Sequence, residues 1–204
     1  MATGITIVVA DQHPIMRAGL LSVLQGAIDL RVIGEASDGT QAVDMCREFR
    51  PDVLLLDIHL AKLEGLMVAY QLSNAYQAPR IMLLSTISNA DVVQAALDAG
   101  VSGYILKDVT GNNLRQAIYR VARGQRVLLG VEKPQPRKRP PLSIRELVTL
   151  RYMADGLSTR EIAGHMSSST RTIETYINRI FHKLDANNRT QAVTIAHREQ
   201  LLVV

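Results

Sequence analysis

The chain has 204 residues, enough for one medium domain and one small one. Hydrophobic residues make up 47% of the sequence, which excludes wholesale disorder, and no apolar run approaches the roughly 20 residues that cross a bilayer. The single cysteine, Cys46, permits no internal disulfide, and the N-terminus lacks the basic-then-apolar layout of a signal peptide. We therefore expect a soluble cytoplasmic protein with no membrane partner.

Charge is divided unevenly along the chain, whose formal net charge is +4. Residues 1–124 hold 10 Lys and Arg against 12 Asp and Glu, whereas residues 125–204 hold 13 against 7. The smaller, basic part is typical of a protein that binds a polyanion, most often nucleic acid. A solvated basic surface without any partner would give the same charge distribution.

The first 124 residues alternate short apolar runs with segments of helical spacing. The apolar runs predict five strands, at Ile5–Ala10, Arg31–Ala36, Val53–Leu56, Ile81–Leu84 and Gly103–Leu106. The other segments predict five helices, at Pro14–Gln25, Thr40–Phe49, Leu66–Tyr76, Ala90–Ala99 and Asn113–Arg123. Gly100 and Gly124 follow two of these helices, where a residue with positive φ is common. Strict alternation indicates an α/β fold, a doubly wound five-stranded parallel sheet.

The alternation stops after residue 124. Residues 125–141 contain four prolines and several Lys and Arg, which is typical of an exposed linker. We therefore divide the chain into a first domain (1–124), a linker (125–141) and a second domain (142–204). The second domain is predicted to be all-α, with four helices at Ser143–Ala154, Thr159–His165, Thr170–Leu184 and Arg189–Leu201. Ser143 with Glu146, and Ser158 with Glu161, have the spacing of capping boxes.

Polar residues end or follow four of the predicted strands: Asp11, Asp57, Ser85 and Lys107. In a parallel sheet these strand ends meet at one edge. Two carboxylates, a hydroxyl and a lysine are the set that phosphoryl transfer to an aspartate needs, with a divalent cation such as Mg²⁺ neutralising the incoming oxygens. Taken singly, each residue has a plainer explanation, as a helix cap, a turn hydroxyl or a surface lysine.

Residues 5–123 resemble the receiver domain of two-component response regulators. The similarity lies in Val8–Pro14, Asp52–Asp57, Leu83–Thr86 and Gly103–Asp108. It implies that Asp57 accepts a phosphoryl group from a histidine kinase, and that Asp11, Asp57 and the backbone carbonyl of His59 hold Mg²⁺. It also implies a switch in which Ser85 moves toward the phosphate, Lys107 contacts it and Tyr104 turns inward.

The sequence departs from this family pattern at three positions. Gln12 stands where a second acid is usual, Ala61 where proline is usual, and Thr86 where a small residue is common. Because Gln12 removes one negative charge, Mg²⁺ binding and phosphorylation are expected to weaken. The alternative is a pseudo-receiver that regulates without phosphate. His13 and His59 are expected to be loop or capping side chains, because neither has a partner spaced for metal binding.

The predicted helix Thr170–Leu184 has one apolar face and one polar face. The apolar side chains follow the spacing of a buried stripe, at Ile173, Ile177, Ile180, Phe181 and Leu184. The opposite face carries Arg171, Glu174, Thr175, Asn178, Arg179 and His182. A four-helix interaction module with a solvated polar face would have the same pattern.

Residues 142–193 resemble the LuxR-type helix-turn-helix of NarL/FixJ-class regulators. The resemblance implies that this helix enters the major groove of double-stranded DNA, with Glu174, Thr175 and Asn178 facing bases. We assign five further residues to DNA phosphates: Ser169, Thr170, Arg171, Arg179 and Lys183. Glu174 could instead pair with Arg171 one turn away and never contact a base.

Together these features predict a DNA-binding response regulator in which phosphorylation of Asp57 modulates dimerisation and sequence-specific binding to promoter DNA. One small module contacts too little DNA for specific binding, so we expect a homodimer on two half-sites. The last predicted helix offers apolar residues for packing within the domain or across the dimer. We do not expect an enzyme, because a haloacid dehalogenase-type phosphatase needs a second acid two residues after its aspartate, where His59 stands.

Overall fold

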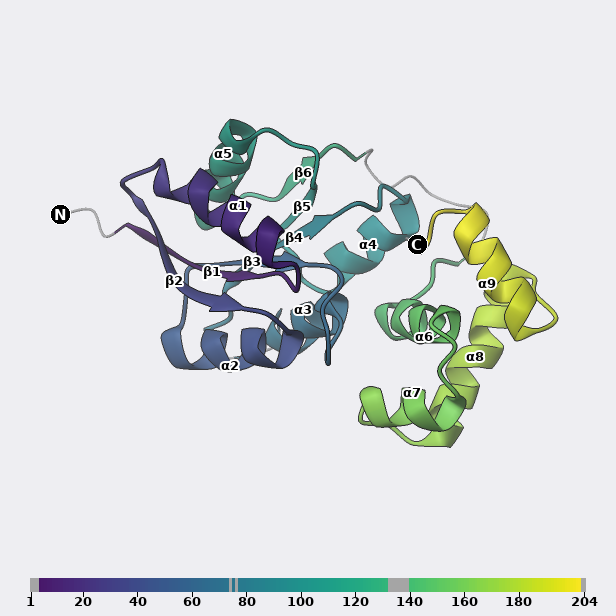
Figure 1. Ribbon diagram of the computed structural model, residues 1–204. Helices are drawn as coiled ribbons and strands as arrows, with labels where there is room; N and C mark the ends of the chain where they lie inside the picture. Colours follow the sequence, from purple (N-terminus) through teal and green to yellow (C-terminus); the bar gives the residue numbers. More distant parts are fainter. Residues whose placement is uncertain (1–3, 74, 76, 132–139, 203–204) are drawn as a thin grey trace. The chain divides into compact units, whose positions relative to one another are not determined.

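The computed structural model describes residues 4–73, 75, 77–131 and 140–202 (Figure 1). The chain divides into two compact units, residues 1–86 with 96–131 and residues 87–95 with 132–204. Within the described ranges, no helix combines the length and the apolar character that crossing a membrane requires.

The first unit is built on a six-stranded parallel sheet with strand order β2-β1-β3-β4-β5-β6. The strands are β1 (Ile5–Ala10), β2 (Leu30–Ala36), β3 (Val53–Asp57), β4 (Arg80–Ser85), β5 (Gly103–Leu106) and β6 (Val127–Leu129). Every residue of β3 is buried, as expected for a central strand that is covered on both faces. The predicted doubly wound parallel fold is confirmed, and the first five strands have the flavodoxin-like order.

Strand β6 corrects the prediction of five strands, and it lies in the segment that we assigned to the linker. Val127 pairs in parallel with Gly103, and its N–H donates to the carbonyl oxygen of Ser102 at 3.0 Å. Its side chain is buried in the core. Three apolar residues beside arginines and prolines are too short a run to predict a strand. The rest of the predicted linker, residues 132–139, lies outside the described residues.

Helices cover both faces of the sheet. They are α1 (Pro14–Gln25), α2 (Gly39–Phe49), α3 (Gly65–Ser73) and α5 (Gly111–Ala122). Helix α4 (Ala90–Asp98) is divided between the two units, with residues 90–95 in the second. Helices α1 and α5 lie together on one face, and α2 and α3 lie on the other (Figure 1). Gly100 and Gly124 have φ of 86° and 82°, as predicted for residues that follow helices. Helix α3 ends at Ser73, so its predicted end was wrong, and Tyr76 lies outside the described residues.

Four helices form most of the second unit, as predicted. They are α6 (Ile144–Ala154), α7 (Thr159–His165), α8 (Thr170–Leu184) and α9 (Arg189–Arg198), and both predicted capping boxes are present. Helix α9 ends three residues earlier than predicted. The chain turns at Gln200, whose φ is 55°, and the N–H of Leu201 donates back to the carbonyl of Ala196 at 2.9 Å. Ala192, Ile195 and Ala196 are buried within the chain, where α9 packs against α6 and α8.

The start of α3 packs closely against the end of β3. The N–H of Gly65 donates to the carbonyl of Ile58 at 3.0 Å. A Cβ atom added at Gly65 would lie 2.0 Å from the carbonyl oxygen of Asp57. Because no side chain fits this gap, glycine is required where the chain turns back from the strand end.

We predict that Gly65→Ala lowers the free energy of unfolding by about 1–3 kcal/mol, because backbone must shift to admit the methyl group. The matched control is Gly19→Ala in α1, where an added Cβ meets nothing within 4 Å. There the substitution should leave stability unchanged or raise it by up to about 1 kcal/mol, because alanine favours helix. Urea denaturation measures both, and equal losses at the two positions would contradict this packing.

Candidate functional site

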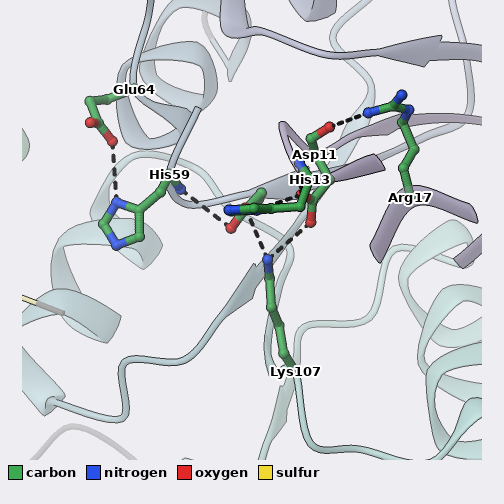
Figure 2. A network of polar contacts seen from close by, with 7 residues as sticks. Asp11, His13, Arg17, His59, Glu64 and Lys107 are labelled. Carbon is green, nitrogen blue, oxygen red and sulfur yellow. Dashed lines mark hydrogen bonds and ion pairs between the residues drawn. The ribbon is translucent and has the colours of Figure 1, made fainter. Parts of the chain in front are cut away.

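The carboxyl ends of β1 and β3 and the residue after β5 form a buried cluster of opposite charges (Figure 2). The Nζ of Lys107 lies 3.0 Å from Oδ2 of Asp11 and 2.9 Å from Oδ2 of Asp57. Asp11 and Asp57 are 0% and 2% exposed. One ammonium group therefore bridges two carboxylates away from bulk water.

Burial and charge act together on this cluster. Burial raises the pKa of Asp57, and the negative charge of Asp11 adds to this effect, against the lowering by Lys107. Burial alone would lower the pKa of Lys107, but hydrogen bonds and attraction from Asp57 and Asp11 reverse the effect and raise it. Lys107 is thus held in its charged form. When both carboxylates are ionised, the cluster keeps one uncompensated negative charge, which attracts a further cation.

His13 lies closer to the carboxylates than the sequence indicates. Its backbone N–H donates to Oδ1 of Asp11 at 2.8 Å, and its Nδ1 lies 3.2 Å from that oxygen and 3.9 Å from Oδ2 of Asp57. His13 occupies the N-cap position of α1, yet its side chain makes no capping hydrogen bond. His13 thus stands in the loop at the start of the helix, as predicted, but its ring also contacts a carboxylate of the cluster, which the sequence spacing did not indicate.

The cluster has the donors of a divalent cation site. Within the part of the chain that the structure describes, Asp11, His13 and Asp57 each offer a ligand atom, and these atoms lie within 4.8 Å of one another. Mg²⁺ binds through one or two carboxylates together with water and phosphate, so Asp11 and Asp57 fit this ion. Gln12 is exposed beside them and adds no charge.

His59 follows the strand end and turns its ring away from the cluster (Figure 2). Its backbone N–H donates to Oδ1 of Asp57 at 3.3 Å, whereas its Nδ1 lies 3.4 Å from Oε2 of Glu64. The assignment of its backbone carbonyl to Mg²⁺ stays a prediction.

Ser85 and Tyr104 lie on the two adjacent strands β4 and β5. Both are fully buried, and the hydroxyl of Tyr104 shares a hydrogen bond with Ser85. Burial raises the pKa of Tyr104 well above its usual range. The backbone N–H of Lys107 donates to the carbonyl of Ser85 at 2.9 Å, which ties these strand ends together. Tyr104 thus has the inward position, while the movement of Ser85 toward a phosphate stays a prediction.

Arg17 also contacts the cluster, and we did not predict it as a site residue. Its Nη1 donates to the backbone carbonyl of Asp11 at 2.8 Å, and its Nε lies 3.4 Å from Oε2 of Glu35. His13 and Arg17 are four residues apart at the start of α1. That spacing is the sequence signal that both side chains lie on the same side of the helix.

In the second unit, α8 presents a continuous polar surface. Its buried side is formed by Ile173, Ile180 and Leu184, with Ile177 and Phe181 half-buried, as predicted. The predicted polar residues are all exposed: Arg171, Glu174, Thr175, Asn178, Arg179 and His182. A shallow hollow on this side is lined by Thr175, Asn178, Arg179, His182 and Lys183.

The N-terminus of α8 has a well-formed cap. The Oγ of Ser169 accepts a hydrogen bond from the N–H of Thr172 at 3.1 Å, and Thr170 beside it is exposed. The hydroxyl of Thr175 donates to the carbonyl of Arg171 at 3.0 Å. Ser169 and Thr170 therefore lie at the helix end that favours anions, although their contacts with DNA stay predictions.

Lys183 has a structural partner that the sequence did not reveal. Its Nζ lies 2.8 Å from Oε2 of Glu146 and 2.8 Å from the carbonyl oxygen of Pro141. Glu146 is 2% exposed and also closes the capping box of α6 with Ser143. This partly buried ion pair weighs against the predicted contact between Lys183 and a DNA phosphate.

Two protein families match successive parts of the chain. Residues 7–119 match the response regulator receiver domain, and residues 140–196 match the luxR family of bacterial regulatory proteins. The transcriptional regulatory protein LiaR of Bacillus subtilis is 31% identical over 209 residues, which cover 97% of this chain and 99% of LiaR. The response regulator protein VraR of Staphylococcus aureus is 30% identical over 206 residues, again covering 97% of this chain and 99% of the relative.

Solved structures show the same two-part fold. The response regulator ChrA of a heme-sensing two-component system is 32% identical, with a TM-score of 0.54, and the match covers 98% of this chain and 100% of ChrA. RcsB from Salmonella enterica serovar Typhimurium, bound to promoter rprA in the presence of the phosphomimetic BeF3−, is 22% identical. Its TM-score is 0.76, with 96% of this chain and 99% of RcsB covered, so it supports the fold alone.

We predict that Lys107→Met destabilises the protein by about 3 kcal/mol, because it leaves two buried carboxylates without their shared cation. The loss should be smaller when the same substitution is made in an Asp57→Asn background, where only Asp11 remains charged. A double-mutant cycle of urea denaturation curves measures the coupling. Additive losses would show that the ion pair contributes nothing between these two positions.

Proposed function

The chain belongs to the bacterial response regulators that combine a receiver domain with a LuxR-type DNA-binding domain, and we propose that phosphorylation of Asp57 controls its binding to promoter DNA. Members of this family are DNA-binding transcriptional regulators and not enzymes. The family therefore argues against a haloacid dehalogenase-type phosphatase. The observation that carries the proposal is the buried cluster in which Lys107 bridges Asp11 and Asp57.

The chemistry that this cluster supports is phosphoryl transfer to a carboxylate. One oxygen of Asp57 attacks the phosphorus of a phosphohistidine on a kinase, so that a P–O bond forms as the P–N bond breaks and the histidine leaves. Mg²⁺, when bound by Asp11 and Asp57, supplies positive charge to the phosphoryl oxygens. The ammonium of Lys107 then moves its hydrogen bond to the acyl phosphate, while the hydroxyl of Ser85 provides a second donor.

The DNA-binding part of the proposal rests on α8. Its exposed polar side offers a carboxylate, a hydroxyl and an amide at Glu174, Thr175 and Asn178, which suit the edges of bases in a major groove. Arg171 and Arg179 flank them as cations for phosphates. We propose that the protein binds two half-sites as a homodimer, in the cytoplasm, and that a histidine kinase supplies the phosphoryl group.

Gln12 favours a second candidate, a pseudo-receiver that regulates DNA binding without phosphate. The exposed amide adds no charge to the cluster, so the site attracts a cation through Asp11 and Asp57 alone. The two candidates differ in one measurable property, the dependence of DNA affinity on a phosphoryl donor.

We predict that a small-molecule acyl phosphate with Mg²⁺ raises the affinity of the full chain for its selected operator by roughly tenfold, a coupling of about 1.4 kcal/mol. Asp57→Asn should abolish this increase and keep the basal affinity. Fluorescence anisotropy on labelled duplexes measures both proteins. An identical affinity with and without donor in the wild type would favour the pseudo-receiver.

We predict different effects for base-facing and phosphate-facing residues of α8. Asn178→Ala should cost about 1–3 kcal/mol on the selected operator and relax preference at one base pair. Arg171→Ala should weaken binding to all duplexes alike and reduce the salt dependence of binding by about one counterion.

Arg198→Ala is the matched control, because this exposed arginine lies at the end of α9. It should leave both the operator preference and the salt dependence unchanged. If Asn178→Ala and Arg171→Ala reduce affinity equally on every sequence, the assignment of Asn178 to a base is wrong.

A further inference from the structure

We infer that the imidazole of His13 is a third protein ligand in the cation site, and that the receiver binds a first-row transition ion such as Mn²⁺ more tightly than Mg²⁺. The inference rests on the proposed function only for the location of the cation at Asp11 and Asp57. Cation binding itself can be measured without any phosphoryl transfer.

Three donor side chains, those of Asp11, His13 and Asp57, have ligand atoms within 4.8 Å of one another. The Nδ1 of His13 lies 3.2 Å from Oδ1 of Asp11 and 3.9 Å from Oδ2 of Asp57. Ligands about 2.0–2.2 Å from a shared metal ion lie roughly 3–3.5 Å from one another, so a small movement of an exposed ring suffices.

The contacts of each carboxylate oxygen indicate where a cation would bind. Lys107 contacts Oδ2 of both carboxylates, and the N–H of His59 donates to Oδ1 of Asp57. Oδ1 of Asp11 faces His13 through both its ring and its backbone N–H. The imidazole therefore meets the oxygen of Asp11 that Lys107 does not contact, and it approaches Oδ2 of Asp57, which Lys107 also contacts.

The donor set explains the preference among cations. With the exposed, neutral Gln12 in place of a second acid and Lys107 balancing one carboxylate, the site offers little charge to a hard ion such as Mg²⁺. An imidazole adds a nitrogen donor without adding charge. Nitrogen donors suit first-row transition ions, whereas Mg²⁺ prefers oxygen.

The polar contacts of this ring are with the two carboxylates of the cluster. His13 makes no side-chain cap on α1, and its ring is 64% exposed, so it is not held by packing. His59, by contrast, has its ring against Glu64 and turned away from the carboxylates. The two histidines beside the cluster thus differ in direction, and only His13 faces the cation site.

The test measures Mn²⁺ binding to the full chain by electron paramagnetic resonance. The wild type should show coupling of Mn²⁺ to a ¹⁴N nucleus in pulsed spectra. His13→Ala should lose this coupling and bind Mn²⁺ roughly tenfold or more weakly, while its affinity for Mg²⁺, measured by competition, changes by less than about twofold. The control His197→Ala removes an exposed imidazole of α9 and should keep both the coupling and the affinity.

A second variant tests the role of the missing acid. Gln12→Asp should raise the affinity for Mg²⁺ and make Mn²⁺ binding less dependent on His13, because the added carboxylate replaces the imidazole as a ligand. Persistence of the ¹⁴N coupling in His13→Ala, or its absence in the wild type, would overturn the inference.

Phosphorylation of Asp57 by an acyl phosphate in Mg²⁺ is scored separately by mass spectrometry. If the wild type is phosphorylated but shows no ¹⁴N coupling, the role of His13 is rejected and the proposed phosphate control stands. A wild type that shows the coupling but is never phosphorylated rejects the proposed phosphate control and supports the role of His13.

Discussion

The charged form of Lys107 allows two carboxylates to lie together at the buried end of a parallel sheet. A buried carboxylate without a partner would take up a proton or destabilise the fold, and two of them would also repel each other. Asp57 cannot move away from Asp11, because every residue of β3 is buried between helices. The sheet thus fixes the distance between the acids, and the lysine makes that distance tolerable. Any chemistry at this edge of the sheet therefore depends on the ammonium of Lys107, which can exchange one hydrogen-bond partner for another while it stays in the cluster.

The loop after β3 is tied to a neighbouring helix by an ion pair. Nζ of Lys62 in this loop lies 2.6 Å from Oδ2 of Asp38, the residue that caps α2. Although burial alone would raise the pKa of Asp38, hydrogen bonds from Lys62, Thr40 and the backbone of Gln41 lower it to about 2. The chain that follows Asp57 is therefore held against α2, whereas His13, which follows β1, is exposed.

The sequence predicted the parts of the site that depend on strand ends. Apolar strands with polar last residues place Asp11, Asp57 and Lys107 together through topology alone. It did not predict the direction of the His13 ring, because the contact with Asp11 depends on the backbone turn between the two residues and the approach to Asp57 depends on the tertiary fold. Strand β6 was missed because its edge position requires only three residues. The pairing of Lys183 was missed because it joins α8 to the start of α6, and charge patterns along one helix do not reveal it.

The contacts within the second unit also change the meaning of the basic composition. Lys183 is bound to a buried glutamate, and Nη2 of Arg189 donates to two backbone carbonyls at the end of α6, at 2.7 and 2.6 Å. These cations stabilise the fold through hydrogen bonds to partly buried groups. A lysine or arginine that is paired with a buried group cannot also neutralise a DNA phosphate unless that pair breaks, which would leave a buried group unpaired. The electrostatic part of DNA binding therefore depends on exposed cations such as Arg171 and Arg179, so net charge alone overstates the number of phosphates that this domain can neutralise.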